Sequence, residues 1–242
     1  MRSFGLVEDK VYEADFFLEK IKDCIDPKEC NYYFSAFLSA SRSITFSLQA
    51  CMSDIKGFKE WYEEKQVILK RDKIARKFVE MRNVTQKIGE HFITSGNYYT
   101  DDNGNLRGKF YFQDEMNSYC IGENPREIIL KRVLSGELFT HQEEDVATQC
   151  DKNFIMLIEI IFESFQKFGS TIDPEKYYTL ENLELLGLSI EDIETTLGFP
   201  KGYTNVEGIS NEDRIKFLRE SEPSSEIDYI FMKYLNKARY RE

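Results

Sequence analysis

The chain has 242 residues, of which 41% are hydrophobic and 14% aromatic, and its formal net charge is −11. This length suits one large domain, or a medium-sized domain with a small appendage. The acidic balance argues against a surface that binds nucleic acid throughout, because contacts with phosphate need clustered cations. It leaves room for one local basic patch.

The five cysteines are widely spaced without a C-x-x-C motif, and the chain has only two histidines. This pattern predicts neither a disulfide framework nor a zinc site, and we expect no cofactor and no metal. The sequence shows no N-terminal apolar signal segment and no run of 18 apolar residues. We therefore predict a soluble, cytoplasmic protein that does not bind membranes.

Apolar residues recur at helical spacing through the first 90 residues. They predict helices at about residues 11–25, 30–54 and 58–70. Asp72 is expected to cap a fourth helix, which ends near Gly89. The short connections between these helices favour antiparallel neighbours in a bundle.

The spacing of apolar residues changes after the fourth helix. Aromatic and β-branched residues lie on both sides of Asn103-Gly104, which is a strong signal for a β-hairpin. We expect strands near residues 92–100 and 106–113, and a lone hairpin of this size should lean on the bundle. Residues 115–139 fit either a short helix or a strand.

Thr140 and Glu143 form a capping box, which predicts a long helix that ends near Phe168. Its nearly continuous apolar run suits a central position in the core. Four shorter helices are expected at residues 177–186, 190–197, 211–220 and 226–240. The predicted fold class is mainly α, with a helical domain over residues 1–169 and a small helical subdomain over residues 170–242.

The segment LENLELLGLSIEDIETTLG has the spacing of a helix-turn-helix, with Gly187 at the turn and Ser189 as an N-cap. The second of these helices begins with three carboxylates, Glu191, Asp192 and Glu194. Because carboxylates repel phosphate, we expect no DNA binding here. A helical hairpin used for packing or for protein contact fits the segment better.

One basic stretch stands out in this acidic chain. Residues 65–87 contain eight basic and two acidic residues, which gives a local charge of 8 − 2 = +6. The stretch is either a solvated helix face paired with acidic neighbours or a surface that binds anions. The candidate RNA- or anion-binding residues are Arg76, Lys77, Arg82 and Lys87.

The helix NYYFSAFLSASRSITFSLQA, with FVEMRN on a following helix, resembles the HEPN superfamily over roughly residues 10–90. The resemblance implies a dimeric helical bundle, and many members are metal-independent ribonucleases. Their motif is an Arg, a polar residue, and a His five to seven residues after the Arg. Arg82 and Asn83 match the first half of the motif. The positions where His belongs hold Lys87, Ile88 and Gly89.

This departure bears on the chemistry of the site. Histidine exchanges protons at neutral pH because its pKa is about 6.5, whereas lysine, with a reference pKa of about 10.4, is a poor base. Arg82 keeps the planar fork that binds phosphate. His91 lies nine residues after Arg82, out of phase on a continuous helix. The motif therefore favours anion binding over cleavage.

Three functions are left open by the sequence. The first is a non-catalytic HEPN-like homodimer that binds RNA or a protein partner, in a stress or phage-defence system. The second is a metal-independent endoribonuclease with a rearranged site, in which Arg82 and Asn83 act with Lys87 or His91. The third is a structural protein-interaction module, in which Arg82 only complements the dipole at the end of its helix.

Overall fold

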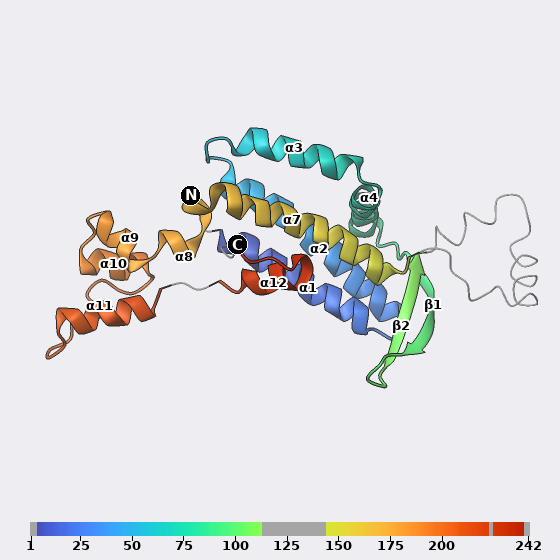
Figure 1. Ribbon diagram of the computed structural model, residues 1–242. Coiled ribbons are helices and arrows are strands. Elements are labelled where there is room, and N and C mark those ends of the chain that lie inside the picture. Colours follow the sequence, from blue (N-terminus) through green and yellow to red (C-terminus); the bar gives the residue numbers. More distant parts are fainter. Residues whose placement is uncertain (1–3, 113–143, 223–224, 240–242) are drawn as a thin grey trace, which may run out of the picture. The chain divides into compact units, whose positions relative to one another are not determined.

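The computed structural model describes residues 4–112, 144–222 and 225–239 (Figure 1). These residues are mainly helical, with a small antiparallel hairpin and a set of C-terminal helices, as the sequence predicts. The chain forms two compact units. Asp9–Leu157 is called the bundle unit below, and Met1–Glu8 with Ile158–Glu242 is called the C-terminal unit. The domain boundary expected near residue 169 stays a prediction.

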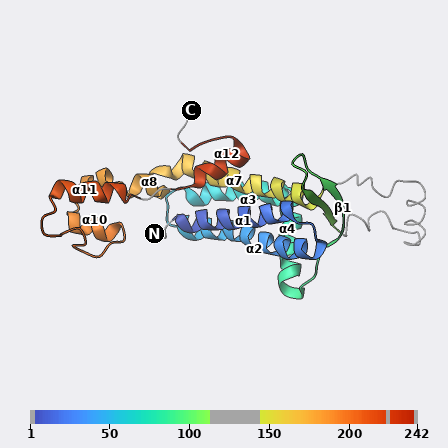
Figure 2. The same cartoon turned by 90° about the horizontal axis from the view of Figure 1, so that it is seen from below.

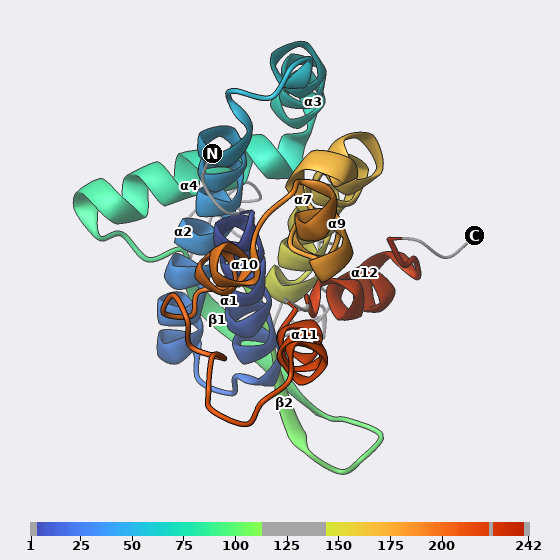
Figure 3. The same cartoon turned by 90° about the vertical axis from the view of Figure 1, so that its left-hand side faces the viewer.

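The bundle unit contains most of α1, the first part of α7 and all elements between them. The bounds of these elements are α1 Gly5–Asp23, α2 Pro27–Met52, α3 Phe58–Arg71, α4 Lys73–Ile88, β1 Ile93–Thr100, β2 Leu106–Phe112 and α7 Val146–Ile172. The four N-terminal helices are therefore confirmed. Figure 2 shows α1 and α2 lying alongside each other, and Figures 1 and 3 show α4 running crosswise to α2 and α3.

Side-chain caps explain where several of these helices begin. The carboxylate of Asp26 accepts a hydrogen bond from the backbone N–H of Glu29, at 3.2 Å, at the start of α2. Asp72 accepts from the N–H of Ala75, at 2.8 Å, and so caps α4 as expected. At the other end of α4, Gly89 has a φ of 75°, a left-handed conformation that glycine adopts without steric cost.

A cluster of phenylalanine rings forms the centre of the bundle unit. Phe34 and Phe37 from α2 lie 5.6 and 6.4 Å from the ring of Phe78 on α4, measured between ring centroids. Phe112 from β2 is 5.1 Å from Phe34, and Phe154 from α7 is 6.3 Å from Phe37. All five rings are buried. Edge-to-face packing of this kind adds to the stability that burial provides.

The hairpin is joined to the bundle by one buried amide. The side chain of Asn31 on α2 donates to the carbonyl oxygen of Ile93, at 2.6 Å, and accepts from the N–H of Ile93, at 3.0 Å. Asn31 thus pairs with the first residue of β1 as a neighbouring strand would. At the other end of the hairpin, Asp101 and Gly104 form the turn, Gly104 with a φ of 83°. The predicted hairpin and its support by the bundle are confirmed.

The C-terminal unit contains the rest of α7 and five short helices. Their bounds are α8 Pro174–Tyr177, α9 Leu180–Leu185, α10 Ile190–Thr196, α11 Asn211–Glu220 and α12 Ile227–Leu235. The last helix is shorter than the sequence predicts, because Asn236 adopts a left-handed conformation with a φ of 54°. The expected capping box and residues 115–139 lie outside the described residues. The described part of α7 has its first turn capped by Asp145, which accepts from the N–H of Thr148 at 3.0 Å.

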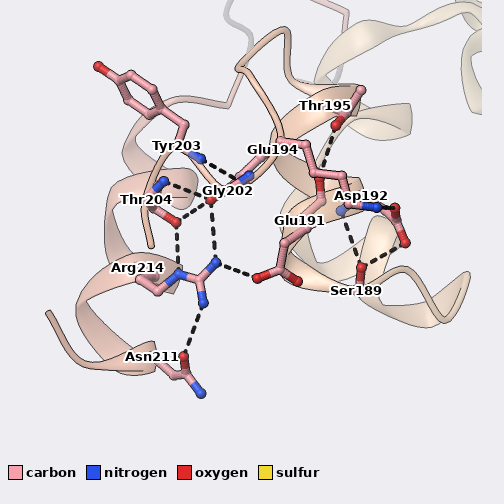
Figure 4. Close-up of polar contacts among 11 residues, drawn as sticks. Ser189, Glu191, Asp192, Glu194, Thr195, Gly202, Tyr203, Thr204, Asn211 and Arg214 are labelled. Carbon is pink, nitrogen blue, oxygen red and sulfur yellow. Dashed lines mark hydrogen bonds and ion pairs between the residues drawn. The ribbon is translucent and has the colours of Figure 1, made fainter. Parts of the chain in front are cut away.

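Two buried arginines organise the polar contacts of the C-terminal unit. Arg239 is 3% exposed and pairs with Asp173, Glu175 and Asp228 at 3.1, 2.7 and 3.1 Å. Arg214 on α11 pairs with Glu191 at 2.8 Å (Figure 4). Because each arginine joins segments that are distant in the sequence, it fixes how those segments pack.

Glu194 corrects one expectation of the helix-turn-helix interpretation. We expected its carboxylate on the exposed start of the second helix, but it is fully buried. It accepts hydrogen bonds from the N–H groups of Tyr203 and Thr204, at 3.1 and 2.8 Å, and from Gly202 (Figure 4). Burial acts to raise its pKa, but hydrogen bonds from the Thr204 hydroxyl and from the N–H groups of Thr204 and Gly202 lower the pKa to about 2. Glu194 therefore holds a loop in place.

Within residues 4–112, 144–222 and 225–239, no helix combines the length and the apolar character needed to cross a bilayer.

Candidate anion-binding site

An exposed stripe of basic residues runs along α4. Lys73, Arg76 and Lys87 are three and eleven residues apart, so at about 100° per residue they project within an arc of about 60°. All three side chains are exposed, and so are Lys70 and Arg71 at the end of α3. We call these five residues the basic stripe.

The basic stripe lacks acidic partners in the described part of the chain. No ion pair there involves any of its five residues, or Arg82. These six side chains therefore do not form a helix face whose charges are neutralised by acidic neighbours, which was the other interpretation of the sequence. These unpaired cations form a local positive surface on a chain whose net charge is −11.

Lys77 is turned away from the basic stripe. Its ammonium group donates to the side-chain oxygen of Gln149 at 3.2 Å and lies 4.2 Å from the centre of the Phe112 ring. The side chain is half-buried and joins α4 to α7 and β2. Its contacts are those of a packing residue.

A cavity of about 300 Å³ lies beside the basic stripe, between α2, α3, α4 and α7 of the bundle unit. Four cations line it, together with one carboxylate, that of Glu80. The cations are Arg42, Lys70, Arg76 and Arg82. The apolar part of its lining is Leu38, Leu69, Ala75, Phe78, Val79 and Leu157. The cavity thus combines a positive charge with an apolar wall, and we call it the α2–α4 cavity.

The structure brings together some of the residues singled out from the sequence and separates others. Arg76 and Arg82 both line the α2–α4 cavity, whereas Lys77 and Lys87 do not. Arg82 and Lys87 lie on one continuous helix, five residues apart, and so project about 140° apart. Asn83 is exposed and accepts a hydrogen bond from Nη1 of Arg82 at 3.4 Å.

Arg82 has a polar atom that the folded chain leaves unsatisfied. The side chain is half-buried, and its Nε is covered but has no hydrogen-bond partner among the described residues. The hydroxyl of Ser41 on α2, which lines the same cavity, is also buried without a partner. Buried polar groups are almost always hydrogen-bonded in folded proteins. Two exceptions in the lining of one cavity therefore point to this cavity as a site.

His91 lies beyond the end of α4. Its ring is exposed and meets the ring of Tyr32 edge-on, with 5.9 Å between centroids. β1 begins two residues later, at Ile93, close to the expected position. His91 is not among the residues that line the α2–α4 cavity.

Comparison with known proteins finds one family that part of the chain resembles. Residues 14–95 match the family model described as bacteriophage lambda protein ea47. The match covers about a third of the chain, including α2, α3 and α4 in full. No curated protein and no solved structure matches the chain.

The ea47 match corrects the HEPN interpretation. That resemblance covered roughly residues 10–90, the segment that matches the ea47 model, and it is wrong. It depended on helical periodicity and on one Arg-Asn pair. Periodicity of this kind occurs in any amphipathic bundle helix, and Arg82 and Asn83 contact each other locally. Neither observation was specific to one family.

The sequence interpretation missed most of the cavity lining. Its polar residues outside α4 are Ser41, Arg42, Thr45, Tyr62, Gln66, Lys70 and Asn153. One signal was present: Ser41 lies within the apolar stripe of α2 and Arg42 follows it directly. The contribution of α3 and α7 depends on tertiary packing, which no local pattern reveals.

Proposed function

We propose that this chain is a non-catalytic RNA-binding protein that acts during the infection of a host cell by a phage. The observation that carries the proposal is the basic stripe, whose five exposed cations have no acidic partner in the described part of the chain. RNA phosphates are the ligand that such a row of cations recognises. The ea47 match, to a phage protein, supports the setting.

The length of the stripe suits a polymeric ligand. Lys73 and Lys87 are fourteen residues apart, which corresponds to about 21 Å along a helix axis. A single phosphate cannot contact both ends. A flexible chain of phosphates can, and it releases counterions at each contact. The acidic remainder of the protein repels phosphate and so limits binding to this stripe.

The arrangement of the site supports binding without cleavage. Metal-independent cleavage needs an acid and a base within reach of the same phosphate. Arg82 and Lys87 project about 140° apart on α4, and His91 lies past the end of that helix. Of these three residues, only Arg82 lines the α2–α4 cavity. We therefore favour binding over the alternative of a rearranged ribonuclease.

The test compares two triple variants with the same loss of charge. One removes Lys73, Arg76 and Lys87 from the stripe by substitution with Ala. The control replaces three exposed lysines elsewhere, Lys28, Lys59 and Lys216, with Ala. Both are titrated with a fluorescently labelled single-stranded RNA of mixed sequence in EDTA, and binding is measured by anisotropy.

We expect the stripe variant to bind RNA at least tenfold more weakly than the wild type, and the control variant to bind within about twofold of it. Equal weakening in both variants would mean that only net charge matters, and would contradict a defined site. The same samples are examined for RNA fragments. Cleavage that disappears in Arg82→Ala would contradict the non-catalytic part of the proposal.

A further inference from the structure

We propose that the α2–α4 cavity binds a small organic anion, a molecule with one carboxylate or phosphate group and an apolar body. This site adjoins the RNA contact on the basic stripe, with which it shares Lys70 and Arg76, but it takes a ligand of a different class. Four observations carry the inference: an unused edge of Arg82, an unpaired hydroxyl, the charge of the lining and the size of the cavity.

The guanidinium of Arg82 has one edge occupied and one edge free of protein partners. Its Nη1 donates to Asn83 at 3.4 Å, while Nε has no partner in the part of the chain that the structure describes. Nε and Nη2 form the edge of arginine that binds the two oxygens of a carboxylate or phosphate side by side. Because Nε is covered, a rotation of the guanidinium is needed to turn this edge to a ligand.

Ser41 on α2 supplies a second unused group in the lining. The residue is 5% exposed, and its hydroxyl has no hydrogen-bond partner. The neighbouring hydroxyl of Thr45, in contrast, donates to the backbone oxygen of Arg42 at 2.9 Å. A serine hydroxyl can donate to an oxyanion after a simple rotation. Ser41 and Arg82 thus give one cavity a neutral and a charged donor, from two different helices.

The charges of the lining select for an anion. Four cations face one carboxylate, so the net charge of the lining is 4 − 1 = +3. None of the four cations has an ion pair in the described part of the chain. Arg42 donates a hydrogen bond from Nη1 to the hydroxyl of Thr45, another lining residue, at 3.3 Å. An organic cation would be repelled.

The size and the apolar wall define the rest of the ligand. A cavity of about 300 Å³ is at the lower end of the range for small-molecule sites, about 300–1,000 Å³. It excludes a folded nucleic acid or a protein domain. Leu38, Phe78 and Leu157 offer an apolar surface. Inorganic phosphate has no apolar part and would not cover this surface. A monomeric anion with a ring or short aliphatic chain fits both features.

Isothermal titration calorimetry of the full chain with five probes tests the proposal. Benzoate and phenyl phosphate carry the expected chemistry and distinguish a carboxylate from a phosphate ligand. Inorganic phosphate lacks the apolar body, benzyl alcohol lacks the charge, and benzylamine reverses it. We expect benzoate or phenyl phosphate to bind at least tenfold more tightly than the last three. Equal binding of inorganic phosphate, or no binding of either aromatic anion at millimolar concentration, overturns the proposal.

Two variants locate the binding. Arg82→Gln should weaken the preferred aromatic anion at least tenfold, and Ser41→Ala should weaken it about threefold or more. Ser41→Ala removes a hydroxyl that has no partner, so it leaves the fold intact. A double variant, Lys73→Ala/Lys87→Ala, removes two stripe residues that do not line the cavity, and it should bind the small anion as the wild type does. Loss of anion binding in that variant, with no loss in Arg82→Gln, would place the anion on the stripe and contradict a cavity site.

Discussion

Replacing Glu194 by Gln is predicted to loosen the loop that Glu194 holds. One carboxylate oxygen accepts from the N–H groups of Gly202 and Tyr203, and the other accepts from the N–H and the hydroxyl of Thr204 (Figure 4). Glutamine has one oxygen and one NH₂ group. In either orientation, the NH₂ group faces at least two donors, which are left without an acceptor.

The magnitude follows from these lost acceptors. Leaving a buried donor unpaired costs about 1–3 kcal/mol. Two such donors, together with the loss of the charge near Arg214, 3.4 Å from the carboxylate, give a destabilisation of about 3–5 kcal/mol. Opening of the loop and of α11 should become at least about 100-fold more frequent, since each 1.4 kcal/mol is a factor of about ten.

Hydrogen exchange measured by mass spectrometry is the suitable assay, because it reports on residues 199–220 separately from the rest of the chain. Glu184→Gln is the matched control, since Glu184 is an exposed residue of the neighbouring helix α9. We expect about 100-fold faster exchange in Glu194→Gln, and an unchanged rate in Glu184→Gln. Exchange within about threefold of wild type in Glu194→Gln would refute the role assigned to this carboxylate.

Two further predictions concern other parts of the chain. Burial raises the pKa of Glu8 from 4.5 to about 6, so the folded state holds this proton more tightly and loses stability as pH rises from about 4.5 through 6. The measurement is the melting temperature of Glu8→Gln minus that of the wild type. This difference should increase by a few degrees between pH 4.5 and pH 7.5, and a difference that does not change with pH would contradict the prediction. Asn31→Ala should destabilise the bundle unit by about 2–4 kcal/mol, because both backbone groups of Ile93 lose their partner. Urea unfolding, followed by the fluorescence of Trp61, measures this change. The exposed control Asn83→Ala should change stability by less than about 0.5 kcal/mol, and equal effects would count against the anchor.

Local signals in the sequence were sufficient for most of the secondary structure. Asp72 caps α4 and Gly89 ends it, as expected, because capping depends on a few neighbouring residues. The turn at Asn103-Gly104 likewise joins two strands close to their predicted bounds. The apolar stripe of α2 is buried from Phe34 to Met52, since the residues of one helix face share one environment.

Tertiary packing decided what the local signals could not. Ile88 continues the apolar stripe of α4, yet it is 75% exposed, because periodicity shows which residues share a face and not how far a neighbouring element covers that face. Glu194 was expected at the surface, as charged residues usually are. Its burial depends on donors from a loop eight to ten residues further on.

The candidate site was predicted in part. The basic character of residues 65–87 was evident from composition, and three of its members, Lys73, Arg76 and Lys87, share the exposed face of α4. Arg82 was singled out for a ribonuclease motif, but its own helix turns it towards the α2–α4 cavity. The cavity itself depends on Ser41 and on residues of α3 and α7. Only the tertiary fold brings these residues into one cavity with Arg82.

The salt dependence of RNA binding tests the central claim most directly. Each phosphate contact with single-stranded nucleic acid contributes about −0.7 to the slope of log K against log salt concentration. Five contacts from the basic stripe predict a slope of about −3.5 and a loss of affinity of about 100-fold between 50 and 200 mM salt. Removing Lys73, Arg76 and Lys87 should reduce the slope to about −1.4. A slope that stays the same in that variant, or no RNA binding by the wild type at 50 mM salt, would contradict the assignment of the stripe as the RNA contact.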